Sequence, residues 1–145
     1  MVCLMVLIML VGFFYMPYDP NAMDTENALQ FFSPAHPLGT DQFGRDILSR
    51  IMEGTRVSFL VGALTVVFGL IVGGAIGAIA GYYGGKIDEV IMKLIDTQMA
   101  FPGVLLALML IAVFGNSMQN LILALGVMSI PRFARISRSG FIKYR

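Results

Sequence analysis

The sequence predicts an all-α fold, a polytopic membrane helix bundle with about four transmembrane helices and two short amphipathic helices at the membrane surface. Of the 145 residues, 57% are hydrophobic and 13% are charged, whereas soluble domains carry about 25% charged residues. Residues 57–85 contain no charge, and this stretch exceeds the roughly 20 residues that a helix needs to cross a bilayer. Residues 97–131 are also uncharged. They are too many for one crossing helix, so two spans joined by a polar hairpin at 115–120 fit better.

The central stretch carries a glycine stripe. Its four glycines recur at every fourth residue and share one face of a helix: Gly69, Gly73, Gly77 and Gly81. In a membrane, such a stripe lets a neighbouring helix approach closely. We therefore expect helix packing at this stripe, with a glycine-lined conduit or a hinge as the alternatives.

Residues 1–16 form an apolar run that ends at Pro17. The run has neither a positive amino-terminal region nor a small-residue cleavage site, which favours a first transmembrane helix over a signal peptide. Because the run is short for a full span, we expect the natural start of this helix to lie upstream. Residues 17–56 are predicted to form an external loop, in which His36 is expected to be solvated.

The second part of that loop, residues 40–56, is predicted to be an amphipathic helix. Its apolar positions recur at helical spacing: Phe43, Ile47, Leu48, Ile51 and Met52. Thr40 is a plausible N-cap, and Asp41–Arg45 and Asp46–Arg50 are favourable i,i+4 pairs. Asp41 and Asp46 could instead form a catalytic carboxylate pair. On a helix they would point about 140° apart, so the structural interpretation is favoured.

Two further charged segments lie beside the long apolar stretches. Residues 86–96 are predicted to be a second short amphipathic helix, with Glu89 and Lys93 as an i,i+4 pair. Three arginines follow the last apolar run at every third position: Arg132, Arg135 and Arg138. Arginine at this spacing also occurs in voltage sensors. Here the arginines follow the apolar run instead of lying within it, so a basic cytoplasmic helix end is the favoured interpretation.

The basic residues predict the membrane topology. Residues 17–56 contain three Lys or Arg residues, whereas residues 86–96 and 132–145 together contain seven. Cytoplasmic segments carry the excess of Lys and Arg. The first loop is therefore predicted to be external, and residues 84–96, residues 132–145 and both termini of this chain are predicted to be cytoplasmic.

Residue counts exclude several classes of site. Cys3 is the single cysteine and His36 the single histidine, so this chain cannot form an internal disulfide, a cysteine or histidine metal cluster, or a histidine-based triad. A net charge of +1 gives no reason to expect a nucleic acid partner. We predict no catalytic, cofactor-binding or metal-binding residue, and the sequence does not identify the substrate pathway.

Three long blocks resemble one membrane family, the second permease subunit of bacterial dipeptide, oligopeptide and nickel ABC importers. The blocks are HPLGTDQFGRDILSRIMEGTRVSFLVG (36–62), GYYGGKIDEVIMKLIDTQMAFP (81–102) and IPRFARISRSGFIKYR (130–145). The resemblance implies a type I importer permease in the bacterial inner membrane, with residues 57–145 as the N-terminal part of its transmembrane domain. It also implies four partners: a second permease, two cytoplasmic ATPase subunits that bind the ATP, and an external substrate-binding protein. The chain itself has no phosphate-loop motif.

The chain departs from the family pattern at its end. In the family, a Glu-Ala-Ala…Gly coupling motif that docks on the ATPase follows the block that ends here at Arg145. The chain therefore resembles a truncated subunit in which Arg132, Arg135 and Arg138 approach the coupling segment. We expect the 145 residues alone neither to recruit the ATPases nor to support uptake. The alternatives are a fragment of an unrelated secondary transporter or channel, an intramembrane enzyme, and a small structural membrane protein.

Overall fold

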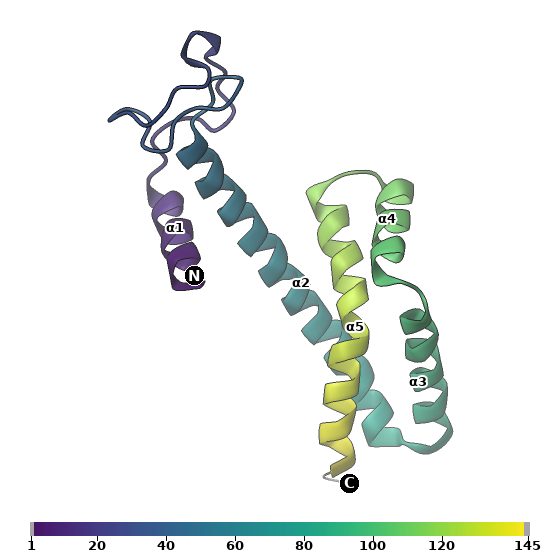
Figure 1. Ribbon diagram of the computed structural model, residues 1–145. Helices are drawn as coiled ribbons and strands as arrows, with labels where there is room; N and C mark the ends of the chain where they lie inside the picture. Colours follow the sequence, from purple (N-terminus) through teal and green to yellow (C-terminus); the bar gives the residue numbers. More distant parts are fainter. Residues whose placement is uncertain (1, 144–145) are drawn as a thin grey trace. The chain divides into compact units, whose positions relative to one another are not determined.

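The computed structural model describes residues 2–143, which form five α-helices and one short 3₁₀ helix and contain no strand. The elements are α1 (Val2–Phe14), η1 (Thr25–Asn27), α2 (Ile47–Tyr83), α3 (Gly85–Ala100), α4 (Gly103–Phe114) and α5 (Met118–Lys143) (Figure 1). The predicted all-α fold is confirmed. Tyr144 and Arg145, which belong to the predicted basic tail, lie outside the described residues. The chain divides into two compact units, residues 1–60 and 61–145, which are described separately.

In the first unit, α1 packs against the beginning of α2. Gly12 of α1 faces Met52, and a Cβ atom at Gly12 would lie 2.9 Å from the Cβ of Met52. The Arg56 guanidinium lies 4.3 Å from the ring centre of Phe13, at a distance typical of a cation–π contact. The apolar run at the start of the chain is therefore helical, as predicted, and ends shortly before Pro17.

The helix that was expected to begin at Thr40 begins at Ile47. The Thr40 hydroxyl does not cap this helix. It accepts the Gln30 N–H at 2.9 Å and donates to the Asn27 carbonyl at 2.5 Å, so it binds the preceding loop. Residues 40–46 form a turn, which an isolated bridge between Thr40 and Asp46 closes. Within this turn Gly44 has a φ of +74°, and a Cβ atom there would collide with the Asp24 carbonyl oxygen.

The predicted amphipathic helix and the central span are one continuous helix, α2, of 37 residues. Neither a proline nor a turn sequence interrupts residues 47–83, so the charged first turns continue directly into the apolar part. Among the described residues, α2 is the helix long and apolar enough to cross a membrane by itself. The α3–α4 pair passes the same test only if it counts as one span bent by 87°. Crossings at residues 1–16 and 118–130 stay predictions.

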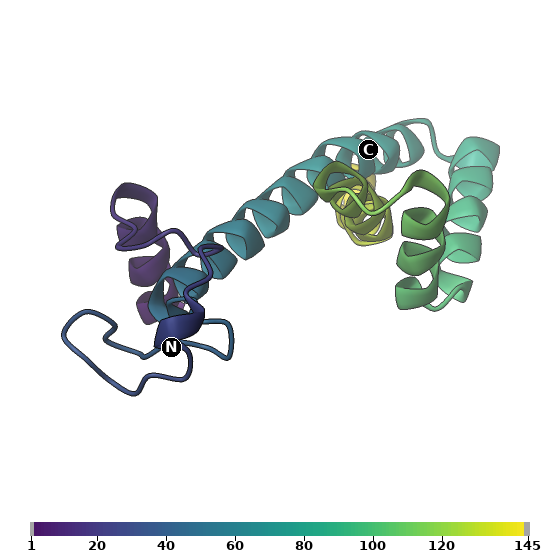
Figure 2. The same ribbon diagram turned by 90° about the horizontal axis from the view of Figure 1, so that it is seen from above.

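In the second unit, α5 lies beside the later part of α2, and a short turn connects it to α4 (Figure 1 and Figure 2). The hairpin predicted between the two apolar runs is confirmed at residues 115–117. The Asn120 side chain closes it by donating to the carbonyls of Phe114 at 2.6 Å and Gly115 at 3.0 Å. The sequence placed the end of the last apolar run at Pro131, but α5 continues through this proline to Lys143.

The fully buried apolar positions of the second unit are mostly alanines. Ala80 and Ala134 are fully enclosed, and Ala124 and Ala107 are nearly so. Small side chains at these positions let the backbones of neighbouring helices approach one another. The larger apolar side chains of α4 are exposed instead, among them Val104, Leu108 and Val113. This distribution is typical of a helix bundle whose outer surface is covered by lipid rather than by water.

Candidate functional site

The glycine stripe of α2 lies against α5. A Cβ atom at Gly73 would lie 2.6 Å from the Ile130 carbonyl oxygen, and one at Gly81 would lie 2.7 Å from the Cβ of Phe141. At Gly69 and Gly77, added Cβ atoms would overlap the Ser129 hydroxyl and the Ala134 carbonyl. All four glycines therefore lie at one helix–helix contact, where there is no room for a side chain.

Polar groups of α5 bind the backbone of α2 along the same contact. The Ser137 hydroxyl donates to the Gly74 carbonyl at 2.8 Å. The Ser129 hydroxyl lies 3.5 Å from the Thr65 carbonyl and donates within its own helix to Gly126 at 2.7 Å. Sequence reasoning missed these serines. They could have been found because Gly126, Ser129, Ala134 and Ser137 place a second stripe of small residues on one face of a helix.

Two of the three predicted arginines pair with acidic residues of α3. The Arg135 guanidinium lies 2.5 Å from Asp96, and Arg138 makes two hydrogen bonds to the Asp88 carboxylate, one of them at 2.5 Å. Two parallel N–H···O bonds of this kind are stronger and more directional than a single ion pair. Sequence reasoning missed these partners because they lie 39 and 50 residues away along the chain. The ion pairs attach α3 to α5.

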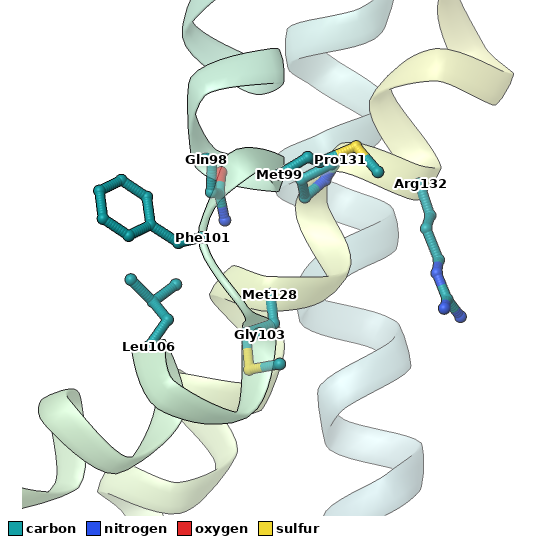
Figure 3. A pocket seen from close by; sticks show the side chains of 8 residues that line it. All are labelled: Gln98, Met99, Phe101, Gly103, Leu106, Met128, Pro131 and Arg132. Atoms are coloured by element: carbon teal, nitrogen blue, oxygen red, sulfur yellow. The ribbon is translucent and has the colours of Figure 1, made fainter.

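The third arginine, Arg132, has a different setting. Arg132 forms no ion pair within residues 2–143. It lines a cavity of about 240 Å³ beside the α3–α4 bend. Figure 3 shows the lining side chains, which come from the end of α3, the start of α4 and the middle of α5. Pro131 and the two neighbours of Pro102 line this cavity together. The two prolines, which flank the uncharged stretch 103–130, therefore lie close to the same cavity.

A second cluster of polar side chains lies in the first unit, before α2. The buried Asp46 carboxylate accepts the Ser49 N–H and hydroxyl, both at 2.8 Å, and lies 3.0 Å from Nδ1 of His36. The ring of His36 also lies against that of Tyr18, with the centroids 4.8 Å apart. The expectation that His36 is solvated is therefore wrong. Asp46 is the N-cap of α2, because it precedes Ile47 and binds the third amide of the helix.

The neighbouring Asp41 binds two arginines. Its carboxylate lies 2.8 Å from Arg45, as predicted, and 2.6 Å from Arg50. Arg50 therefore pairs with Asp41, whereas it was expected to pair with Asp46. Burial would raise the pKa of Asp41, but the backbone amides of Arg45 and Phe43 and the Arg45 side chain lower it to about 2. Both carboxylates are engaged in local hydrogen bonds, which supports a structural role over a catalytic pair.

Residues 73–145 match the family described as the inner membrane component of binding-protein-dependent transport systems. The chain belongs to this family. The matched residues begin within the glycine stripe and include α3, α4 and α5. The contacts of α5 with α3, and its contacts with α2 from Gly73 onward, therefore lie inside the matched region, whereas those with Thr65 and Gly69 precede it.

Among the relatives of this inner membrane component is a glutathione transport system permease protein of Pectobacterium atrosepticum. It is 44% identical over 126 residues, which are 86% of this chain and 42% of the relative. A dipeptide transport system permease protein of Alkalihalophilus pseudofirmus is 45% identical over 82% of this chain and 39% of its own length. Its counterpart in Haemophilus influenzae is 36% identical over 97% of this chain and 50% of its own length. The chain thus spans half or less of these relatives.

Proposed function

We propose that the chain is part of a permease subunit of an ABC importer and contributes to the translocation pathway for di- or oligopeptides. The observation that carries this proposal is the family match together with relatives named for dipeptide and glutathione transport. A second permease, two cytoplasmic ATPase subunits and an external substrate-binding protein complete the proposed importer. ATP is bound by the ATPase subunits, and this chain binds no cofactor. The bacterial inner membrane is the proposed location, with both termini of the chain in the cytoplasm.

The contacts within the second unit support a mechanical role. Helix α5 packs on the later part of α2 through the glycine stripe and holds α3 through Arg135 and Arg138. A displacement of α5 therefore acts on both neighbours. We propose that Arg135 and Arg138 transmit the movement that the ATPase subunits impose from the cytoplasmic side, while Arg132 fixes the end of the apolar run at the membrane surface.

The test is uptake in the host after deletion of the chromosomal gene. We expect loss of uptake of a radiolabelled dipeptide or of glutathione, and recovery when the gene is returned. Uptake of a free amino acid by an unrelated transporter is the control. Loss of nickel uptake with normal peptide uptake would identify nickel as the substrate, which the sequence resemblance also allows. Normal uptake of all three would contradict the proposed function.

A further inference from the structure

Pro131 leaves one backbone carbonyl of α5 without its usual donor. In an α-helix each carbonyl accepts the N–H of the residue four positions later, and proline has no N–H. The carbonyl of Val127 therefore lacks the i+4 donor of a regular α-helix. The Gln98 side chain supplies the missing donor, because its Nε2 lies 2.7 Å from the Val127 oxygen.

This hydrogen bond joins two different helices at a structurally special place. Gln98 lies in the last turn of α3, immediately before the 87° bend between α3 and α4. An unsatisfied carbonyl is costly in a membrane, and proline is tolerated in membrane helices where a neighbour binds the freed group. Gln98 therefore explains how α5 remains helical through Pro131. It also joins the bend to the middle of α5.

Gln98 is the third polar link between α3 and α5. The Asp88–Arg138 pair connects the two helices at the beginning of α3. The Asp96–Arg135 pair and the Gln98 hydrogen bond connect them near the end of α3. The ion pairs and the hydrogen bond together hold α3 along its length, so that its bend follows any displacement of α5.

We propose that Gln98 is a positioning residue for transport, which replaces the missing N–H of Pro131 and makes the α3–α4 bend move with α5. This inference rests on the proposed function. It predicts a dependence between two positions that are distant in sequence: Gln98 is needed only while residue 131 is a proline. A purely space-filling role for Gln98 predicts no such dependence.

A double-mutant cycle tests this dependence in the chromosomal gene. Gln98→Met removes the donor with little change in volume, and Pro131→Ala restores the N–H that Val127 requires. In the native background we expect Gln98→Met to lower the melting temperature of the purified protein by about 2–4 °C. The uptake rate should fall by about three- to tenfold, the equivalent of one interhelical hydrogen bond in a membrane. In the Pro131→Ala background, the same substitution should change neither quantity appreciably. The control is Gln119→Met, at an exposed position of α5.

Each outcome decides between the alternatives. Equal effects of Gln98→Met in the two backgrounds would overturn the inference, because the side chain would then act through packing. Gln98→Met could lower the melting temperature only in the Pro131 background and leave the uptake rate unchanged in both. That result would overturn the positioning role of Gln98 in transport, although it would still support the hydrogen bond. If Gln98→Met protein does not accumulate, the double variant should do so, and its absence would also contradict the inference. Absence of peptide uptake in the strain with the unmutated gene would contradict the proposed function. The melting temperatures of the purified variants would still test the hydrogen bond.

Discussion

Asp46 organises the connection between the first loop and α2. Burial alone would raise its pKa, but the hydrogen bonds from the Ser49 amide and hydroxyl and from His36 outweigh burial and hold the pKa of Asp46 below its ordinary value. The side chain is therefore a carboxylate at neutral pH. A negative charge at the amino terminus of a helix also interacts favourably with the helix dipole. One side chain thus caps α2 and fixes His36 of the loop.

We expect acid to release this loop from α2. A carboxyl group whose folded pKa is depressed contributes its full stability above the ordinary pKa of 3.8, and this contribution is lost as the pH falls through the folded pKa. Protection of the Ser49 amide against hydrogen exchange, corrected for intrinsic exchange, should therefore decrease as the pH falls below the ordinary pKa of 3.8 and through the lower folded pKa of Asp46. Asp41 has a pKa of about 2 and should lose its charge only when the pH approaches that value.

The control for the acid response is Asp46→Asn. Asparagine caps helices about as well as aspartate does, so the variant should retain the helix start but lose the pH dependence of Ser49 protection. The same pH dependence in the variant would show that a different group controls the loop. The carboxylate of Asp46 would then be a cap without a role in the acid response.

At the scale of a helix, the contact between the later part of α2 and α5 depends on the absence of side chains. We expect Gly77→Ala to weaken it, because the new Cβ atom would meet the backbone of Ala134, which cannot turn aside as a side chain could. The matched control is Gly74→Ala, three residues away, where nothing lies within 4 Å of an added Cβ atom. That substitution should be neutral or stabilising by up to about 1 kcal/mol.

The comparison is measured as the melting temperature and membrane abundance of the two variants. A lower melting temperature and abundance of the Gly77→Ala variant, with unchanged values for the Gly74→Ala variant, would support the contact between α2 and α5. Gly77→Leu and Gly73→Leu should go further and prevent assembly with the partner permease. Equal tolerance of Gly77→Ala and Gly74→Ala would mean that the stripe does not pack against α5 in the membrane.

The ion pairs of α3 and α5 are expected to act between the helices. Reversing one charge in Arg138→Asp should lower stability, and the second reversal, Asp88→Arg, should recover part of it. A coupling free energy of about 1 kcal/mol is expected for a pair with two hydrogen bonds. The control is the Glu89–Lys93 pair within α3, whose side chains are 62% and 74% exposed, against 15% for Asp88 and 35% for Arg138. Its coupling should be about 0.3–0.5 kcal/mol. Equal coupling in the two pairs would contradict a special role for Arg138.

Residue periodicity predicted the helical regions of the chain but misplaced several of their ends. The apolar positions from Ile47 to Met52 are on a helix, as their spacing indicates, yet the turn chemistry around Gly44 keeps residues 40–46 out of it. Pro131 suggested an end, but the donor that lets α5 continue comes from Gln98, 29 positions away from the carbonyl it binds. Sequence spacing likewise predicted Asp41–Arg45 and Glu89–Lys93, whereas Arg138–Asp88 depends on tertiary packing that no local pattern contains.

At the scale of the whole chain, the basic residues are unevenly distributed between the segments that lie outside the predicted transmembrane helices. The first loop has three basic residues, and residues 86–96 and 132–145 have seven. The Asp88–Arg138 and Asp96–Arg135 pairs join these last two segments, and we therefore predict that both lie on the same side of the membrane. By the positive-inside rule, we predict that this side is the cytoplasm and that residues 17–54 are external.

This topology predicts opposite accessibility for two engineered cysteines in a background in which Cys3 is replaced. Gln42→Cys, in the exposed turn before α2, should react with a membrane-impermeant maleimide in intact cells. Ser139→Cys, exposed in the last part of α5, should react only after the membrane is opened. A denatured sample provides the control for complete labelling at each site. Labelling of both positions from the same side would overturn the assignment, because the charge count requires an odd number of crossings between residues 42 and 139.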